Sequence, residues 1–251
     1  MSDPEGTPEL SLIFPAYNEA LRLTESLATV RDYLEQQGIR YEILVVDDGS
    51  NDATAGVAAE ALARCRSGRL ISFPANRGKG AAVRAGALEA KGRFVLFSDV
   101  DLSTPIQEEA RLREALEKGA DIAIGSRELP DSKITKAQGR LRQSSGRLFN
   151  LLVRALGLSR LRDTQCGFKM FRREAARKVF SELRTEGFAF DVESLFFAEK
   201  AGLRIAELSV EWHNDEASHV DLAKGLGAFL EVARIRWSYT RRPIQIKPSG
   251  E

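Results

Sequence analysis

The sequence has little cysteine and no long hydrophobic run. Its two cysteines, Cys65 and Cys166, are too few for a framework of disulfide bonds and lack the spacing of a metal-binding motif. No stretch approaches the roughly 20 apolar residues of a transmembrane helix, and the first residues form neither a basic nor an apolar targeting segment. We therefore expect a cytoplasmic protein that contacts a membrane, if at all, from its inner face.

Other absences narrow the fold and the partners. No linker rich in Pro, Gly or Ser divides the 251 residues, which favours one domain. The formal net charge of +1 gives no general attraction to nucleic acid, so we expect no nucleic-acid partner. His213 and His219 lack the four-residue spacing of a helical metal pair. The segment 15–19 is not the GxGxxG turn of a dinucleotide fold, and the chain contains no P-loop.

What the chain does contain is an alternation of short apolar runs and helical patterns. In the first helical pattern, apolar residues at 23, 27, 30 and 34 share one face, and Gly38 follows. Alternating strands and helices predict an α/β fold with a parallel sheet that has helices on both faces and is doubly wound in the first half of the chain. Strands are predicted at 10–14, 41–46, 70–73, 94–98, 121–125 and 206–212, and a turn and a strand within 161–171.

Polar residues follow the predicted strands at their carboxyl ends. The run 94–98 stops on Asp99 and Asp101, and a Thr104-to-Gln107 capping box with Pro105 at the first helical position predicts a helix just beyond. In an open α/β sheet these ends meet in one ligand-binding crevice. An Asp-x-Asp pair there supplies oxygen ligands for Mg²⁺ or Mn²⁺, which can bridge substrate phosphates. The alternative is a solvated strand end.

The second half of the chain is more basic at first and then ends in an amphipathic pattern. Between residues 127 and 154 the chain has seven Lys or Arg and only two acids. This excess of positive charge suits an anionic ligand; the alternative is a solvated helix face. Asp191 and Glu193 lie in the first turns of a predicted helix. They are either functional residues or residues that only cap this helix.

A last helix is predicted at 222–239. Either it packs on the core, or Trp237 and the neighbouring arginines contact an anionic bilayer.

Several motifs together resemble one enzyme family. They are the segments 13–19, 45–52, 76–80, 99–101, 125–127 and 163–169. In this order they are similar to a family 2 inverting glycosyltransferase of the GT-A fold, which has a single domain and a mixed, mostly parallel sheet. Within that family, the segments 163–169 and 190–193 most resemble the dolichyl-phosphate β-glucosyltransferase branch, next to the polyprenyl-phosphate mannose synthases. Where the mannose-synthase branch typically has Gln two residues past the second Asp, this chain has Ser103.

The resemblance implies a role for particular residues. It implies that the nucleotide-sugar donor contacts Pro15, Ala16, Tyr17, Glu19, Asp48, Lys79 and Asp99. It implies a divalent metal, Mg²⁺ or Mn²⁺, on Asp101 and Asp99. Asp101, Arg127 and Asp191 are the implied catalytic residues, and Arg142, Ser144, Asp163 and Gln165 are the implied contacts of the acceptor phosphate.

The reaction implied is metal-dependent transfer of glucose from UDP-glucose to a polyprenyl phosphate. Two alternatives within enzymes are a GDP-mannose donor and a soluble hydroxyl acceptor, and a hydroxyl would need Asp191 or Asp163 as its base. A third alternative is a nucleotide-sugar-binding scaffold without activity. We expect a disordered tail at 1–8, the transferase domain at 9–221, and an amphipathic helix with a basic tail at 222–251. The sequence leaves the oligomeric state open.

Overall fold

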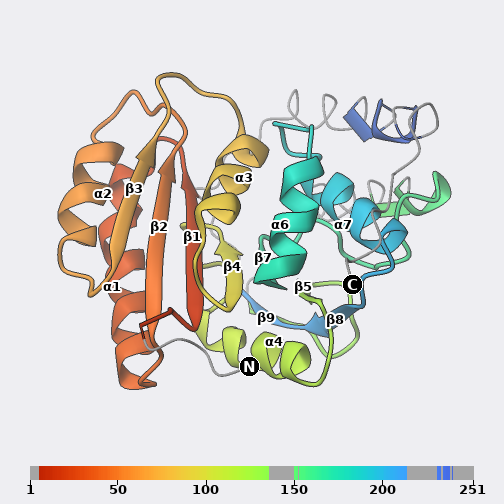
Figure 1. Ribbon diagram of the computed structural model, residues 1–251, viewed down its shortest axis with the longest axis horizontal. Helices are drawn as coiled ribbons and strands as arrows, with labels where there is room; N and C mark the ends of the chain where they lie inside the picture. Colours follow the sequence, from red (N-terminus) through yellow and green to blue (C-terminus); the bar gives the residue numbers. More distant parts are fainter. Residues whose placement is uncertain are drawn as a thin grey trace.

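The computed structural model describes residues 6–135, 150–151, 153–213, 231–232, 234–237 and 239. Strands and helices alternate through most of this chain (Figure 1). In chain order the elements are β1 (Leu10–Ala16), α1 (Ala20–Gln36), β2 (Tyr41–Asp47), α2 (Thr54–Leu62), β3 (Gly68–Ser72), α3 (Lys79–Glu89), β4 (Phe94–Ser98), the 3₁₀ helix η1 (Ile106–Glu108), α4 (Glu109–Glu117), β5 (Ile122–Ser126), β6 (Lys133–Ile134), β7 (Phe168–Arg172), α6 (Arg173–Glu182), α7 (Phe190–Lys200), β8 (Ile205–Ser209) and β9 (Glu211–Trp212).

The main sheet confirms the predicted mixed, mostly parallel architecture. Its seven strands run in the order β3-β2-β1-β4-β7-β5-β8. Neighbours pair in parallel except at β7, which is antiparallel to both β4 and β5. β6 and β9 form a separate small parallel pair. The reversed strand β7 therefore brings the segment that precedes it to the edge where the parallel strands end.

Both faces of the sheet are buried, which explains why the strands are almost continuously apolar. Along β1, Leu12 and Phe14 pack into a core with α1, α2 and α4. Ile13, between them, packs into the opposite core with α3, α6 and α7. Figure 1 shows α3 and α6 together on one side of the sheet and α1 with α2 toward its other face. The period-two alternation thus decides which helices each strand residue contacts.

Two local predictions are wrong. Thr104 does not cap a helix: η1 begins at Ile106 after Pro105 without a side-chain cap, and Thr104 Oγ1 lies 3.9 Å from Cys166 Sγ. The alternating run 206–212 is not one strand, because the chain passes from the main sheet to the small one after Ser209. Alternation reports burial on one side but not which strand is the partner.

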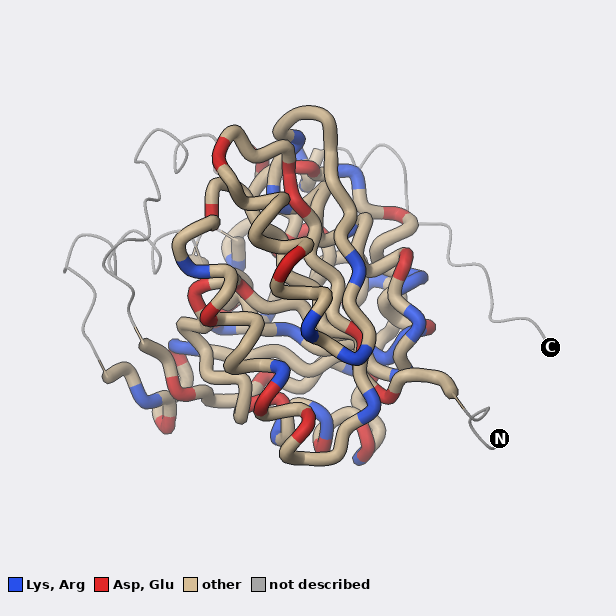
Figure 2. The backbone as a smooth tube through the Cα atoms, turned by 90° about the vertical axis from the view of Figure 1, so that its left-hand side faces the viewer, with Lys and Arg blue, Asp and Glu red and all other residues tan. Residues whose placement is uncertain are grey.

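Some predictions fall outside the described residues. Arg142 and Ser144 do, and so do residues 1–5 of the predicted tail and most of the segment 222–251. Residues 231–232, 234–237 and 239 of the predicted terminal helix are helical. The described part of the chain includes no helix long and apolar enough to cross a bilayer. In Figure 2, Lys and Arg are interspersed with Asp and Glu along the described chain. The predicted domain boundaries stay predictions.

Candidate active site

The carboxyl ends of the parallel strands meet at one edge of the sheet, as predicted. β2, β1, β4 and β5 end there at Asp47, Ala16, Ser98 and Ser126. Because β7 runs in the opposite direction, Phe168 at its start pairs with Ser98. The amide of Asp99 donates to the carbonyl of Gly167 at 3.2 Å. The segment 163–167 is thereby held beside the Asp-x-Asp pair.

Asp48 organises the loop between β3 and α3. Its buried carboxylate accepts hydrogen bonds from Asn76 Nδ2 at 2.9 Å, from the amide of Arg77 at 2.8 Å and from the amide of Gly78 at 2.8 Å. Three donors on one carboxylate fix the path of the chain immediately before Lys79. Asp48 therefore positions α3 relative to the strand ends, whether or not it also contacts the donor.

Lys79 connects this loop to the Asp-x-Asp pair. Its Nζ lies 2.5 Å from Asp99 Oδ1, and the two side chains are 20% and 39% exposed. Burial opposes the charge on Lys79, but Asp99 and then Asp191 outweigh it, so the pKa of Lys79 is raised. The site therefore contains a permanent cation next to Asp99. Lys79 was predicted as a donor contact, and its pairing with Asp99 was not.

Asp101 is the more enclosed acid of the pair. Its Oδ1 accepts the amide of Ser103 at 2.9 Å. Burial and then the nearby charge of Asp99 raise the pKa of Asp101. Two carboxylates that repel one another at a strand end are a suitable donor set for a hard cation.

Gly167 lies directly against Asp99. A Cβ built on Gly167 would be 2.1 Å from Asp99 Oδ2, which no side chain tolerates. Any residue other than glycine would push the Asp99 carboxylate away. Sequence reasoning noted Gly167 only as part of a motif, because nothing in the local pattern reveals a contact across 68 residues.

The loop after β1, which contains several predicted donor contacts, is fixed to the loop after β2. The amide of Asn18 donates to Ser50 Oγ at 2.9 Å, and the amide of Asn51 returns a bond to Asn18 Oδ1 at 2.9 Å. The amide of Glu19 donates to Thr54 Oγ1 at 2.8 Å. Pro15 and Ala16 lie in β1, and the Tyr17 side chain beyond them is 39% exposed. These bonds leave the tyrosine ring accessible to a ligand.

Asp191 forms a buried ion pair with Lys169. Lys169 on β7 is fully buried, and its Nζ lies 2.5 Å from Asp191 Oδ1 and 2.6 Å from the carbonyl of Cys166. Its ammonium also lies 5.2 Å from the centre of the Phe97 ring. Burial raises the pKa of Asp191, although Lys169 and Lys79 oppose the shift. Sequence reasoning missed Lys169, since a lysine in a strand is normally assigned to the solvent side.

Arg127 and Asp163 form a second ion pair. Arg127 donates to Asp163 through its amide at 3.0 Å, through Nε at 2.7 Å and through Nη2 at 2.9 Å. Burial opposes ionisation of Asp163, but Arg127 outweighs it and lowers the pKa of Asp163 to about 2. The amide of Gln165 also donates to Asp163 Oδ1, at 3.1 Å. Asp163 is thus a firmly ionised anchor for Arg127 and a poor proton acceptor near neutral pH.

Within the described residues, Asp99 and Asp101 are the candidate metal ligands. Among the described residues, no group of three His, Cys, Asp or Glu could hold a metal ion. Asp99 and Asp101 nevertheless fit Mg²⁺ or Mn²⁺, since such ions are commonly held by one or two carboxylates together with substrate phosphates. Among the other predicted site residues, Lys79 pairs with Asp99, and the charge of Asp99 also acts on Arg127 and Asp191.

Comparison with known proteins identifies the family to which this geometry belongs. The sequence pattern of glycosyl transferase family 2 matches residues 11–180, most of the chain. The chain belongs to glycosyl transferase family 2. It is a glycosyltransferase, and the edge of the sheet that gathers Asp99, Asp101 and Lys79 is its candidate active site.

Curated relatives in the family share one name. The dolichyl-phosphate beta-glucosyltransferase of Dictyostelium discoideum is 36% identical over 243 residues, covering 92% of this chain and 74% of its own length. The protein of that name from Homo sapiens is 38% identical over 229 residues, covering 84% and 69%.

Solved structures support the same GT-A fold. Mannosyl-3-phosphoglycerate synthase from Rubrobacter xylanophilus aligns with a TM-score of 0.71 at 21% identity, covering 97% of this chain and 79% of its own. Glucosyl-3-phosphoglycerate synthase from Mycobacterium tuberculosis, crystallised with Mn²⁺, UDP-glucose and phosphoglyceric acid, aligns with a TM-score of 0.70 at 20% identity, covering 92% and 80%.

Proposed function

We propose that this glycosyltransferase moves glucose from UDP-glucose to a polyprenyl phosphate with inversion at the anomeric carbon. The observation that carries the proposal is the gathering of Asp99, Asp101 and Lys79 at the strand ends. The names of the relatives at 33–40% identity support glucose as the sugar and a lipid phosphate as the acceptor. The structural relative crystallised with UDP-glucose supports the donor.

Asp101 and Asp99 would hold the divalent metal. When bound, the ion would neutralise the negative charge that develops on the departing nucleoside diphosphate. Because Lys79 pairs with Asp99 at 2.5 Å, its ammonium is already in place to turn from the carboxylate to a diphosphate oxygen. The pairing keeps a flexible side chain ordered before the donor arrives, which lowers the entropic cost of binding.

Arg127 would provide the second fixed cation. Asp163 holds the guanidinium through Nε and Nη2, and Arg127 lies 5.7 Å from the ring centre of Trp212. In the described chain, Nη1 has no partner and stays available for a phosphate oxygen. A guanidinium held in this way stabilises developing charge without having to reorganise during the reaction.

A phosphate acceptor needs no general base, because it is already ionised near neutral pH. In this proposal Asp191 and Asp163 therefore do not remove a proton. Asp163 has both carboxylate oxygens engaged, and Asp191 is engaged by Lys169. Both arrangements suit residues that position cations.

We further propose that the terminal helix contacts an anionic membrane surface, where the lipid acceptor is found. Trp237 is 60% exposed, while Ile235 on the same helix is buried. Tyr239 Oη donates to Glu193 Oε1 at 2.9 Å, which ties this helix to α7. An exposed Trp on a helix anchored to the catalytic domain suits the membrane interface. Flotation with anionic vesicles tests this, and no binding at low salt would contradict it.

The function is tested by product formation. The full chain is incubated with UDP-glucose, Mg²⁺ and a polyprenyl phosphate, and glucosyl lipid is measured by mass spectrometry. GDP-mannose in place of UDP-glucose and a chelator in place of Mg²⁺ serve as controls. Glucosyl lipid only with UDP-glucose and metal supports the proposal. Product from GDP-mannose, or no product from any donor, contradicts it.

A further inference from the structure

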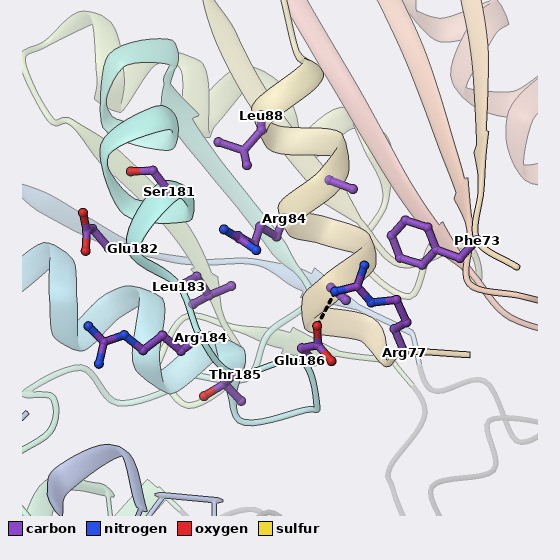
Figure 3. Close-up of a pocket in the computed structure, with 12 residues that line it drawn as sticks. Phe73, Arg77, Arg84, Leu88, Ser181, Glu182, Leu183, Arg184, Thr185 and Glu186 are labelled. Carbon is purple, nitrogen blue, oxygen red and sulfur yellow. Dashed lines mark hydrogen bonds and ion pairs between the residues drawn. The ribbon is translucent and has the colours of Figure 1, made fainter. Parts of the chain in front are cut away.

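A groove lies between α3 and α6 (Figure 3), and neither Asp99 nor Asp101 lines it. It has a volume of about 420 Å³, within the range of small-molecule sites. Its walls come from the β3–α3 loop, the outer face of α3, the end of α6 and the segment that follows α6. None of the residues that line it was predicted to contact the donor, the acceptor or the metal.

The polar side of the groove is cationic. In Figure 3 the guanidinium of Arg84 points from α3 across toward α6. Its Nε donates to the carbonyl of Phe180 at 3.0 Å, whereas Nη1 and Nη2 have no partner within the described residues. A partly buried guanidinium with two unused donor groups is a ready site for an anion.

The acids of the lining do not cancel this charge. Glu186 forms a close ion pair with Arg77, and Figure 3 shows Glu182 directed away from α3. Arg184 also points away from the groove in that view. Arg84 is therefore the cation that faces the space without an acidic partner.

The rest of the wall is apolar. Phe73, with Arg77 stacked 5.2 Å from its ring centre, forms one side. Leu183, Ala81 and Ala85 also line the groove, and Leu88 is 38% exposed. A ligand with one anionic group and a small apolar body would satisfy both parts of such a lining.

The groove is also in contact with the first turn of α3. The carbonyl of Glu186 accepts the amide of Gly80 at 2.8 Å and the amide of Ala81 at 3.2 Å, directly after Lys79. The amide of Thr185 donates to Glu193 Oε2 at 2.7 Å. A ligand that touches Thr185 and Glu186 therefore touches the segment that abuts Lys79 and joins α6 to α7.

We propose that the groove between α3 and α6 binds a small organic anion, with its phosphate or carboxylate group on Arg84 and its apolar body against Phe73, Leu88 and Leu183. This site shares no residue with the predicted donor and acceptor contacts and does not depend on the transferase proposal. Occupancy would act on the segment 183–187 and, through it, on the start of α3.

Calorimetry on the full chain tests the site with phenyl phosphate, benzoate and inorganic phosphate as probes. Phenyl phosphate should bind most tightly of the phosphates, since inorganic phosphate lacks the apolar body. Arg84→Gln should weaken binding about tenfold or more, as expected for the loss of hydrogen bonds from a charged donor. Arg111→Gln, an exposed arginine on α4, is the matched control and should bind as the unaltered chain does.

A second pair of variants guards against misfolding of Arg84→Gln. Leu88 is exposed, so Leu88→Glu and Leu88→Lys should both fold. The glutamate should weaken binding of phenyl phosphate and the lysine should strengthen it, each by a few-fold and more at low salt. Equal affinities in these two variants, or no saturable binding of any probe, would overturn the proposal. Binding that UDP displaces and Leu88→Glu leaves unchanged would assign the anion to the donor site and would also overturn it.

Discussion

Replacement of Lys169 by methionine tests whether the buried pair with Asp191 holds the site together. Lys169 is fully buried, and its Nζ lies 2.5 Å from Asp191 Oδ1. Methionine fills a similar volume but leaves the carboxylate of Asp191 buried without its main counter-charge. Breaking such a pair from one side costs about 3–5 kcal/mol. We expect the lower end of this range, because Lys79 still offsets part of the charge of Asp191.

The predicted loss is large enough to measure by thermal unfolding. For a domain of this size, about 1 kcal/mol shifts Tm by roughly 2–4 °C, so Lys169→Met should lower Tm by roughly 6–12 °C near neutral pH. Circular dichroism melts of both proteins measure the difference. Transferase activity should fall together with the stability, because Asp191 lies near Lys79.

The Tm difference between Lys169→Met and the unaltered protein should also depend on pH. Burial raises the pKa of Asp191, and Lys169 opposes that rise, so removing Lys169 raises the pKa further. A carboxyl whose pKa is raised on folding binds its proton more tightly in the folded state, so its cost to stability shrinks as the pH falls toward that pKa. The Tm difference should therefore be smaller at about pH 5 than at about pH 8.

A double variant tests whether Lys169 and Asp191 are energetically coupled. Lys169→Met combined with Asp191→Leu removes both charges and replaces them with apolar groups, which is close to neutral in comparable cases. The double variant should recover most of the stability lost in Lys169→Met. If the two losses simply add, the pair carries no coupling energy and the account of the buried pair is wrong.

Three further variants test other contacts of the site. Asp163→Asn should lower the free energy of unfolding by about 3 kcal/mol. Because Arg127 lowers the pKa of Asp163 to about 2, this stabilisation is present above about pH 4 and is lost as the pH falls through about 2. The stabilities of variant and parent should therefore converge in acid titrations, and a difference that does not change with pH would contradict this. Gly167→Ala should raise the KM for the donor by about tenfold or more, because its Cβ would displace Asp99, and an unchanged KM would count against that contact. Asp191→Asn, once shown to be folded, should retain substantial turnover with a lipid phosphate, whereas complete loss would favour a hydroxyl acceptor.

Much of the fold follows from local pattern. The spacing of Leu23, Leu27 and Val30 predicts α1. The apolar runs predict the parallel strands, because a strand that is buried on both faces is apolar at nearly every position. The parallel arrangement then predicts that Asp48 and Asp99 come near one another. They are linked through residues 76–79, where Asp48 binds the backbone and Lys79 binds Asp99.

Three contacts that sequence reasoning missed depend on β7. This strand enters the sheet in reverse between β4 and β5, and no local pattern specifies a reversed partner. Its insertion places Gly167 against Asp99 and buries Lys169 beside Asp191. It also places Cys166 near Thr104, whose hydroxyl then does not cap a helix. Long-range pairing, rather than propensity, decided these positions.

In the proposed mechanism, Asp99 and Asp101 hold a divalent cation against the diphosphate of a nucleotide sugar. Calorimetric titration of the protein with UDP-glucose, with and without Mg²⁺, tests it most directly. Binding should be strong only with the metal and should weaken at least about tenfold in Asp101→Asn, while Asp32→Asn, an exposed acid on α1, should bind normally. Equal binding with and without Mg²⁺, and equal binding by Asp101→Asn, would contradict the account.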